Sequence, residues 1–203
     1  MLEGIDSYIY TGLSFSTFSF DEASLLCLKY ELSRFRKKKY LKKLKEVLLT
    51  NPNNCLDANT INYYVHSVIK SINDTTLFLT TNPKIIKLLK KFLKKDVSYS
   101  SYFKIIDLSE EIKMKKACFM IPKRSDLDKY SYLISYFKNY EVVYLEDMVN
   151  EIQEATCIDT IFDKIKLSML KDNDSEIYFI RFDMYSNIAS SYAYDLNKIA
   201  IVL

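Results

Sequence analysis

The amino-acid sequence predicts an α/β fold with an open, mostly parallel sheet of about five or six strands flanked by helices. After residue 74, short continuous apolar runs alternate with helical segments, a pattern typical of βαβ units whose strands are buried on both faces. The chain of 203 residues is 49% hydrophobic and 27% charged, as globular domains are. No apolar run approaches the roughly 18 residues of a membrane-spanning helix. We therefore expect a single α/β domain over residues 1–203.

Residues 1–73 are expected to form a hairpin and two helices ahead of the sheet region at 74–203. Aromatic and aliphatic residues alternate with small polar ones over residues 1–20, which is typical of a short hairpin or of two edge strands. Apolar residues, Phe35 among them, then keep helical spacing to about Thr50. This spacing predicts one long amphipathic helix.

That long helix is expected to begin at a capping box formed by Ser19 and Glu22. The second helix is expected to begin after Asp57, which can cap it.

The sheet region is expected to contain six strands, each read from a continuous apolar run: Thr76–Leu79, Phe103–Ile106, Ala117–Ile121, Val142–Leu145, Ile177–Ile180 and Ile199–Val202. Between them we expect helices that begin near Asn82 and Ser125, and a long helix over residues 148–170.

Two scarcities exclude several chemistries. The only glycines are Gly4 and Gly12, so a glycine-rich phosphate loop or dinucleotide fingerprint cannot follow residue 12. The only histidine is His66, which excludes a two-histidine zinc site and leaves a catalytic triad possible only through that residue. We interpret His66 as a structural or surface residue, and the sequence identifies no cofactor.

The four cysteines are Cys27, Cys55, Cys118 and Cys157, which are at least 28 positions apart. This spacing indicates neither a metal-binding motif nor a redox pair. The acidic N-terminus lacks the apolar stretch of a secretory signal. These observations predict four free thiols and a cytoplasmic protein.

Lysines and arginines cluster in two amphipathic segments, and the clustered cations are candidates for nucleic-acid binding: Arg34, Arg36, Lys37, Lys38, Lys39, Lys42, Lys43, Lys87 and Lys91. Clustered lysines bind DNA or RNA by releasing counterions from phosphates. The alternatives are a solvated face with no ligand, contact with an anionic membrane surface, and contact with the acidic half of a second copy in a homo-oligomer.

A second candidate site follows from the predicted sheet. Ligands of open parallel sheets bind beyond the carboxyl ends of the strands, which selects Thr80, Thr81, Asn82, Lys123, Arg124 and Ser125. Two cations, a hydroxyl and a helix N-terminus would suit a phosphate. We expect the two segments to face each other and to form one anion site.

The leading hypothesis is a non-catalytic protein that binds nucleic acid or a phosphate-bearing ligand through the basic helices and the Lys123 loop. One alternative is a metal-dependent enzyme acting on a nucleotide or a phosphorylated substrate, with Glu146, Asp147 or Asp183 holding the metal. A third hypothesis is an assembly protein with basic and acidic halves.

Overall fold

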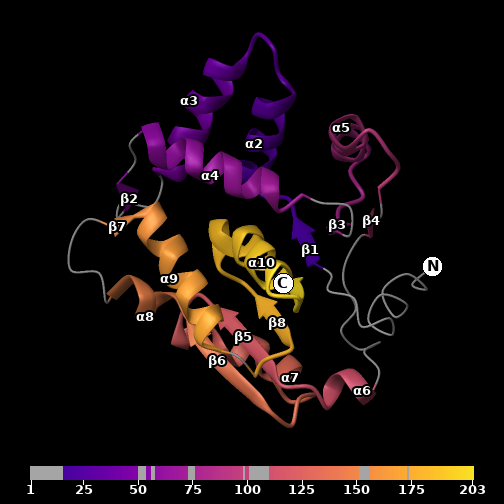
Figure 1. Cartoon of the computed structure of the whole chain (residues 1–203), viewed down its shortest axis with the longest axis vertical. Helices are drawn as coiled ribbons and strands as arrows, with labels where there is room; N and C mark the ends of the chain where they lie inside the picture. The colour runs from indigo at the N-terminus through magenta and orange to yellow at the C-terminus, as the bar shows by residue number, and fades with distance from the viewer. Residues whose placement is uncertain are drawn as a thin grey trace.

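The protein has an α/β fold, and its described residues form a seven-stranded sheet in which every strand pairs in parallel with its neighbours, in the order β4-β3-β1-β9-β8-β5-β6. The computed structural model (Figure 1) describes residues 16–49, 54–55, 58–72, 76–97, 99–100, 110–150, 156–172 and 174–203. The strands are β1 (Ser16–Ser19), β3 (Thr76–Leu79), β4 (Tyr99–Ser100), β5 (Ala117–Ile121), β6 (Tyr140–Tyr144), β8 (Ile177–Ile180) and β9 (Ile199–Val202). The predicted parallel sheet is confirmed.

The helices cover the two faces of the sheet unequally. They are α2 (Glu22–Leu32), α3 (Lys37–Leu48), α4 (Ala58–Lys70), α5 (Pro83–Leu93), α6 (Glu110–Lys113), α7 (Leu127–Ile134), α8 (Leu145–Asn150), α9 (Ile158–Lys171) and α10 (Ser186–Asp195). The core on one face includes residues of α2, α3, α4, α5, α8, α9 and α10, whereas the core on the other face includes residues of α6 and α7. Within the described residues, no helix is both long and apolar enough to cross a membrane.

Strand β1 lies in the interior of the sheet and not at an edge. It pairs in parallel with β3 on one side and with β9 on the other, so the expectation of a hairpin or edge strand is wrong for residues 16–19. The rest of the predicted hairpin, residues 1–15, lies outside the described residues, as does the predicted strand at 103–106.

The long helix predicted up to Thr50 is two helices, α2 and α3, that pack against each other. Asp21 caps α2 by accepting a hydrogen bond from the backbone of Ser24 at 2.7 Å, so the predicted capping residue was wrong by two positions. The chain then turns after Leu32, where the hydroxyl of Ser33 accepts a hydrogen bond from the backbone of Arg36. A side-chain bond to the backbone thus replaces the helical ladder at the turn.

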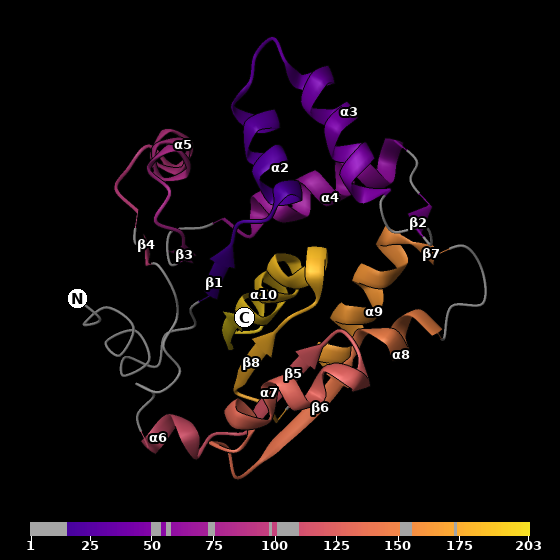
Figure 2. The ribbon, with the colours of Figure 1, turned by 180° about the vertical axis from the view of Figure 1, so that it is seen from behind.

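The prediction of one long helix over residues 148–170 is also wrong. Helices α8 and α9 are separate elements, and strand β7 (Thr156–Cys157) leads directly into α9. It pairs in parallel with β2 (Asn54–Cys55), away from the main sheet. The two strands lie side by side at one flank of the molecule (Figures 1 and 2).

Candidate functional site

The first of the two predicted basic segments, residues 34–45, lies in a helical hairpin that protrudes from the molecule (Figure 1). We call α2, α3 and the turn at residues 33–36 the basic hairpin. The turn lies at one extremity of the molecule (Figures 1 and 2). All seven predicted cations of this segment are solvent-exposed: Arg34, Arg36, Lys37, Lys38, Lys39, Lys42 and Lys43. Within the described residues, none of these seven side chains forms an ion pair.

Helix α3 separates an apolar face from a basic one because of its sequence spacing. Leu44 and Leu48 are fully buried against the core. Two pairs of lysines at i, i+4 spacing, Lys38 with Lys42 and Lys39 with Lys43, occupy the exposed side. Residues four apart on a helix lie on the same face. The basic side of α3 is therefore two parallel rows of ammonium groups.

The N-terminus of α3 has an unfavourable charge arrangement. It has no side-chain cap and no acidic residue in its first turn, which instead contains Lys37, Lys38 and Lys39. The positive end of a helix dipole favours anions and disfavours cations. Lys37 also lies 4.9 Å from the centre of the Tyr30 ring, a cation–π contact that places part of this charge over α2.

Phe35 is the functional candidate that sequence reasoning missed. Helical spacing assigned it to the apolar stripe, but it lies in the turn and is 96% exposed. An isolated exposed apolar residue is common on protein surfaces. Phe35, however, lies between two exposed arginines, Arg34 and Arg36, so an exposed aromatic ring and two cations share one turn. The sequence signal that could have identified it is this Arg-Phe-Arg triplet.

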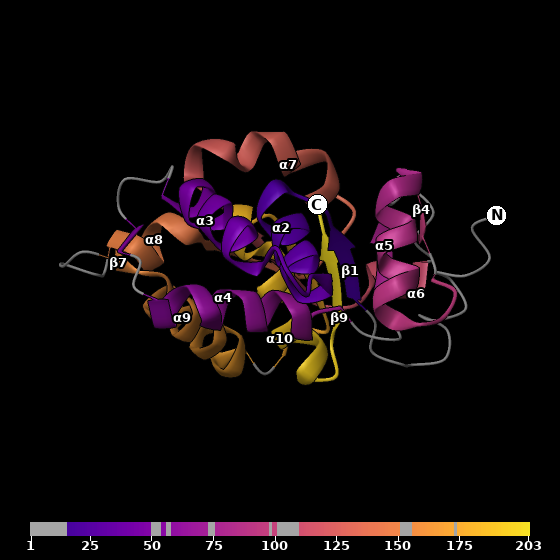
Figure 3. The same ribbon diagram turned by 90° about the horizontal axis from the view of Figure 1, so that it is seen from above.

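Helix α5 contains the other two residues that the sequence predicted to bind nucleic acid. Lys87 and Lys91 are both exposed at i, i+4 spacing, whereas Lys90 pairs with Asp96 at 2.6 Å. Helices α3, α2 and α5 follow one another across the molecule in that order (Figure 3). The lysines of α5 are thus on a different helix from the basic hairpin, with α2 between them.

The predicted shared anion site at the carboxyl edge of the sheet is not formed. Strands β3 and β5 run in the same direction within one sheet, so Thr81 and Arg124 lie at the same edge of it. Strands β1, β9 and β8 separate the two segments. Neighbouring strands are spaced by about 4.8 Å, so the two segments are about 19 Å apart. The expectation that they face each other was therefore wrong, because it assumed a strand order that the chain does not adopt.

The first of these segments, Thr80 to Asn82, acts as the start of α5. Asn82 is the predicted cap, and its side chain accepts a hydrogen bond from the backbone of Lys84 at 3.0 Å. The hydroxyl of Thr80, itself buried, accepts one from the backbone of Asn82. These polar groups are therefore engaged in the turn itself, and ligand binding by Thr80, Thr81 and Asn82 stays a prediction.

The second segment, Lys123 to Ser125, is engaged by carboxylates of the chain itself. The side chain of Arg124 pairs with Asp147 at 2.6 Å and lies 4.4 Å from the centre of the Tyr144 ring. Its backbone N–H donates to the side chain of Glu146 at 2.7 Å. Ser125 does not cap a helix as predicted, because it lies within a short 3-10 turn over residues 124–126. The positions expected to hold a phosphate or a metal thus contact one another.

A cavity of about 270 Å³ opens at the carboxyl edge beside β1, β8 and β9, lined by Ser19, Asp21, Arg181, Met184, Ser186, Asn187 and Val202. Asn187 is buried and joins two elements here. Its side-chain amide donates to the backbone oxygen of Ser19 at 2.9 Å, and its side-chain oxygen accepts from the backbone N–H of Ser19 at 3.1 Å. Both polar atoms of Asn187 are thus used in fixing the end of β1.

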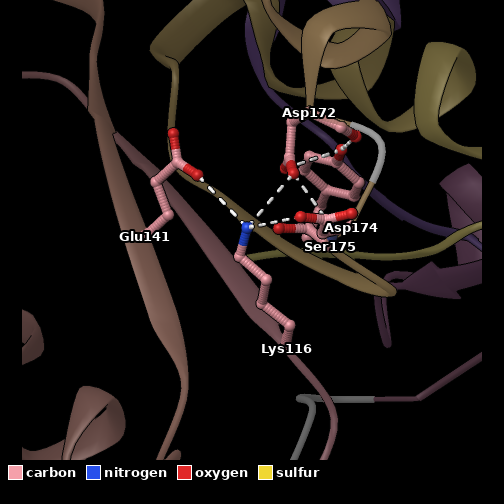
Figure 4. Close-up of polar contacts among 6 residues, drawn as sticks. Lys116, Glu141, Asp172, Asp174 and Ser175 are labelled. Atoms are coloured by element: carbon pink, nitrogen blue, oxygen red, sulfur yellow. Dashed lines mark hydrogen bonds and ion pairs between the residues drawn. The ribbon is translucent and has the colours of Figure 1, made fainter.

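A second charged cluster surrounds Lys116, at the amino ends of β5, β6 and β8 (Figure 4). Its ammonium lies 3.6 Å from a carboxylate oxygen of Glu141, 3.7 Å from one of Asp172 and 3.9 Å from one of Asp174. A cavity of about 420 Å³ adjoins it. The cavity is lined by two cations, Lys116 and Lys171, and by these three carboxylates, so a small excess of negative charge remains, which disfavours an anionic ligand.

Asp172 is the least exposed carboxylate of this cluster. It accepts hydrogen bonds from the backbone N–H of Ser175 and from the hydroxyl of Tyr178, both at 3.0 Å. Partial burial acts to raise the pKa of Asp172, but the hydrogen bonds from Ser175 and Tyr178 and the charge of Lys116 outweigh it and lower that pKa. The cluster lies opposite the edge where ligands of parallel sheets bind, so its geometry fits a structural role.

The cysteines divide into two groups. Cys27 and Cys118 are free, as predicted, and both are buried; burial raises the pKa of both thiols. Cys55 and Cys157 are register partners in the β2–β7 pair. The sequence could not indicate this pairing, because about a hundred residues separate the two positions.

No metal centre or family resemblance accounts for these features. Among the side chains that the structure describes, no group of three or more His, Cys, Asp and Glu residues is placed to hold a metal ion. The single histidine, His66, is exposed on α4. No protein-family model, no curated protein and no solved structure matches the chain.

Proposed function

We propose that the protein binds nucleic acid through the basic hairpin, by charge contacts to phosphates and by stacking of Phe35 on an unpaired base. The observation that carries this proposal is the combination, in one hairpin, of seven exposed cations with Phe35, which lies in the turn and is 96% exposed. Lysine rows neutralise phosphates without reading sequence. We therefore expect binding with little sequence preference.

The absence of local neutralisation supports this proposal. The side chains of Lys116 and Arg124 each contact carboxylates. Within the described residues, the cations of the basic hairpin have no such contact. Lysines at the N-terminus of α3 also oppose the helix dipole. A phosphate at this end would relieve both sources of repulsion.

The Lys123 loop is a weaker candidate for the same function. Its arginine already contacts Asp147, and its exposed backbone N–H is already bonded to Glu146. A phosphate would have to displace both carboxylates. The same contacts weaken the proposal of a metal enzyme that uses Glu146 and Asp147, because a metal would have to compete with Arg124.

The first prediction concerns the lysine rows. Replacing Lys38, Lys39 and Lys42 together by glutamine should weaken binding to a single-stranded oligonucleotide by at least about tenfold at low salt, because each lost phosphate contact removes counterion release. The slope of log affinity against log salt should flatten by about 2–3, since each neutralised phosphate contributes roughly 0.7–0.9. Fluorescence anisotropy of a labelled oligonucleotide at several salt concentrations measures both quantities.

A matched control removes the same charge elsewhere. Lys138, Lys166 and Lys171 are exposed and distant in the sequence from the hairpin, so their triple glutamine variant should keep the wild-type slope. Equal losses in the two variants would mean that net charge alone drives binding, and would contradict the hairpin assignment. Binding to vesicles of anionic lipid, without binding to nucleic acid, would assign the hairpin to a membrane surface instead.

The second prediction separates single strands from duplexes. Phe35→Ala should weaken binding to a single-stranded oligonucleotide by roughly 5- to 150-fold, because stacking on one base contributes about 1–3 kcal/mol. Binding to a duplex of the same sequence should barely change, since its bases stack on one another. The thermal midpoint should also stay constant, because Phe35 is 96% exposed. Equal effects on both nucleic acids, or none on either, would rule out stacking.

A further inference from the structure

Strands β2 and β7 bring together two cysteines that lie about a hundred residues apart in the sequence. The pair is parallel, with Asn54 opposite Thr156 and Cys55 opposite Cys157. Residues opposite each other in neighbouring strands lie on the same face, and the strands are about 4.8 Å apart. Disulfides join residues whose Cα atoms are about 4.4–6.8 Å apart. The register thus places the Cα atoms of Cys55 and Cys157 within the range that a disulfide spans.

Ordered packing fixes the elements that carry this pair. Strand β7 runs directly into α9, and β2 is followed by α4. These two helices pack through aromatic rings, since Phe162 on α9 lies 5.3 Å from the ring centre of Tyr63 and 6.1 Å from that of Tyr64 on α4. Tyr64 and Phe162 are fully buried. The starts of the two helices are therefore held beside each other by the core and not by the two short strands alone.

We propose that Cys55 and Cys157 form a dithiol site that reacts with a low-molecular-weight disulfide, such as oxidised glutathione, to give an intramolecular disulfide. One cysteine thiolate attacks the small disulfide, whose sulfur–sulfur bond breaks and releases one small thiol. The other thiolate then attacks the protein sulfur of this mixed disulfide and releases the second small thiol. The two cysteines are oxidised, the small disulfide is reduced, and the two cysteine protons end on the released thiols.

The other two cysteines provide an internal comparison. Cys27 and Cys118 are 0% and 1% exposed, and burial raises the pKa of both thiols. A buried thiol that stays protonated is a poor nucleophile. In the folded protein, exchange should therefore be confined to Cys55 and Cys157.

The test uses the whole folded chain with oxidised glutathione as the probe. After the reaction is quenched and the protein is unfolded, thiol labelling should count two free cysteines out of four, and the intact mass should show the loss of two hydrogens with no glutathione attached. Peptide mapping without reductant should find Cys55 linked to Cys157. Four remaining thiols, a link to Cys27 or Cys118, or a disulfide-linked dimer would each overturn the proposal.

Single variants distinguish a pair from two separate thiols. In Cys55→Ser and in Cys157→Ser, the reaction should stop at the mixed disulfide, so that glutathione stays on the remaining partner. Two glutathiones on the wild-type protein would show that the partners do not meet. The wild-type disulfide should also raise the thermal midpoint by roughly 5–15 °C, because it closes a loop of about a hundred residues. A lower midpoint would contradict a bond that fits the β2–β7 register.

Discussion

Replacing Phe179 by alanine should lower the free energy of unfolding by about 3–5 kcal/mol, the range found for buried aromatic residues that leave a cavity. Phe179 is fully buried in β8. Its ring centre lies 5.0 Å from that of Phe119 at an interplanar angle of 10°, and 5.2 Å from that of Phe137 in an edge-to-face arrangement. This cluster joins β5, β8 and the segment after α7 on the sparsely covered face of the sheet. Urea unfolding followed by circular dichroism measures the change.

Leu167→Ala is a suitable control for this prediction. Leu167 is on α9 and is 53% exposed, so its truncation should change the free energy of unfolding by about 0.5 kcal/mol or less. A Phe179→Ala variant that lost no more stability than this control would be evidence against the stacked aromatic cluster.

Asn187→Ala is expected to have the second large effect, a loss of about 2–4 kcal/mol of stability. The side chain makes two hydrogen bonds to the backbone of Ser19, at 2.9 and 3.1 Å. Removing it leaves an N–H and a carbonyl without these partners, and each such group costs about 1–3 kcal/mol when it is shielded from water. The thermal midpoint, followed by calorimetry, should fall accordingly.

Asn139→Ala provides the matched comparison, because Asn139 is exposed and its backbone, not its side chain, is hydrogen-bonded to Ala117. Its stability should stay within about 0.5 kcal/mol of wild type. If the two asparagine variants lose stability equally, the bridge from α10 to β1 contributes nothing specific.

The sequence predicted the strands of the sheet region best where every residue of a strand is apolar. Strands β5 and β8 are buried along their whole length, and continuous apolar runs mark them unambiguously. Strand β1 was misjudged because its small polar residues, Ser16 and Thr17, fitted the alternating pattern of a hairpin or edge strand. Both are buried, and the hydroxyl of Thr17 accepts a hydrogen bond from the backbone of Val202 at 2.6 Å. Polar residues can occupy the interior of a sheet when they are bonded in this way.

The order of the strands could not be predicted, and the candidate anion site failed with it. Apolar runs identify strands but carry no information on which strands become neighbours. The chain inserts β9 and β8 between its N-terminal strands and β5, which separates Asn82 from Lys123. Features that depend on a single segment of sequence were predicted more readily. The lysines of α3 are exposed as predicted, since their spacing within one helix defines a face.

Turns without glycine or proline were the other source of error. The turn at residues 33–36 contains neither residue, and the apolar spacing of α2 continues past it into α3. Phe35 consequently appeared to belong to a buried stripe. Contacts between distant segments, such as the pairing of Cys55 with Cys157, leave no local pattern at all.

The position of β9 affects when the sheet can be completed during synthesis of the chain. Strands β4, β3 and β1 form one half of the sheet, β8, β5 and β6 form the other, and β9 is the strand that joins them. It also follows all the other described strands in the sequence. Proteins are synthesised from the N-terminus, so β9 leaves the ribosome after all the other described strands. A half-sheet of β4, β3 and β1 that formed during synthesis would keep β1 as an open edge until residues 199–202 had left the ribosome, and the polar residues of the Ser-Thr-Phe-Ser sequence of β1 would suit such an edge.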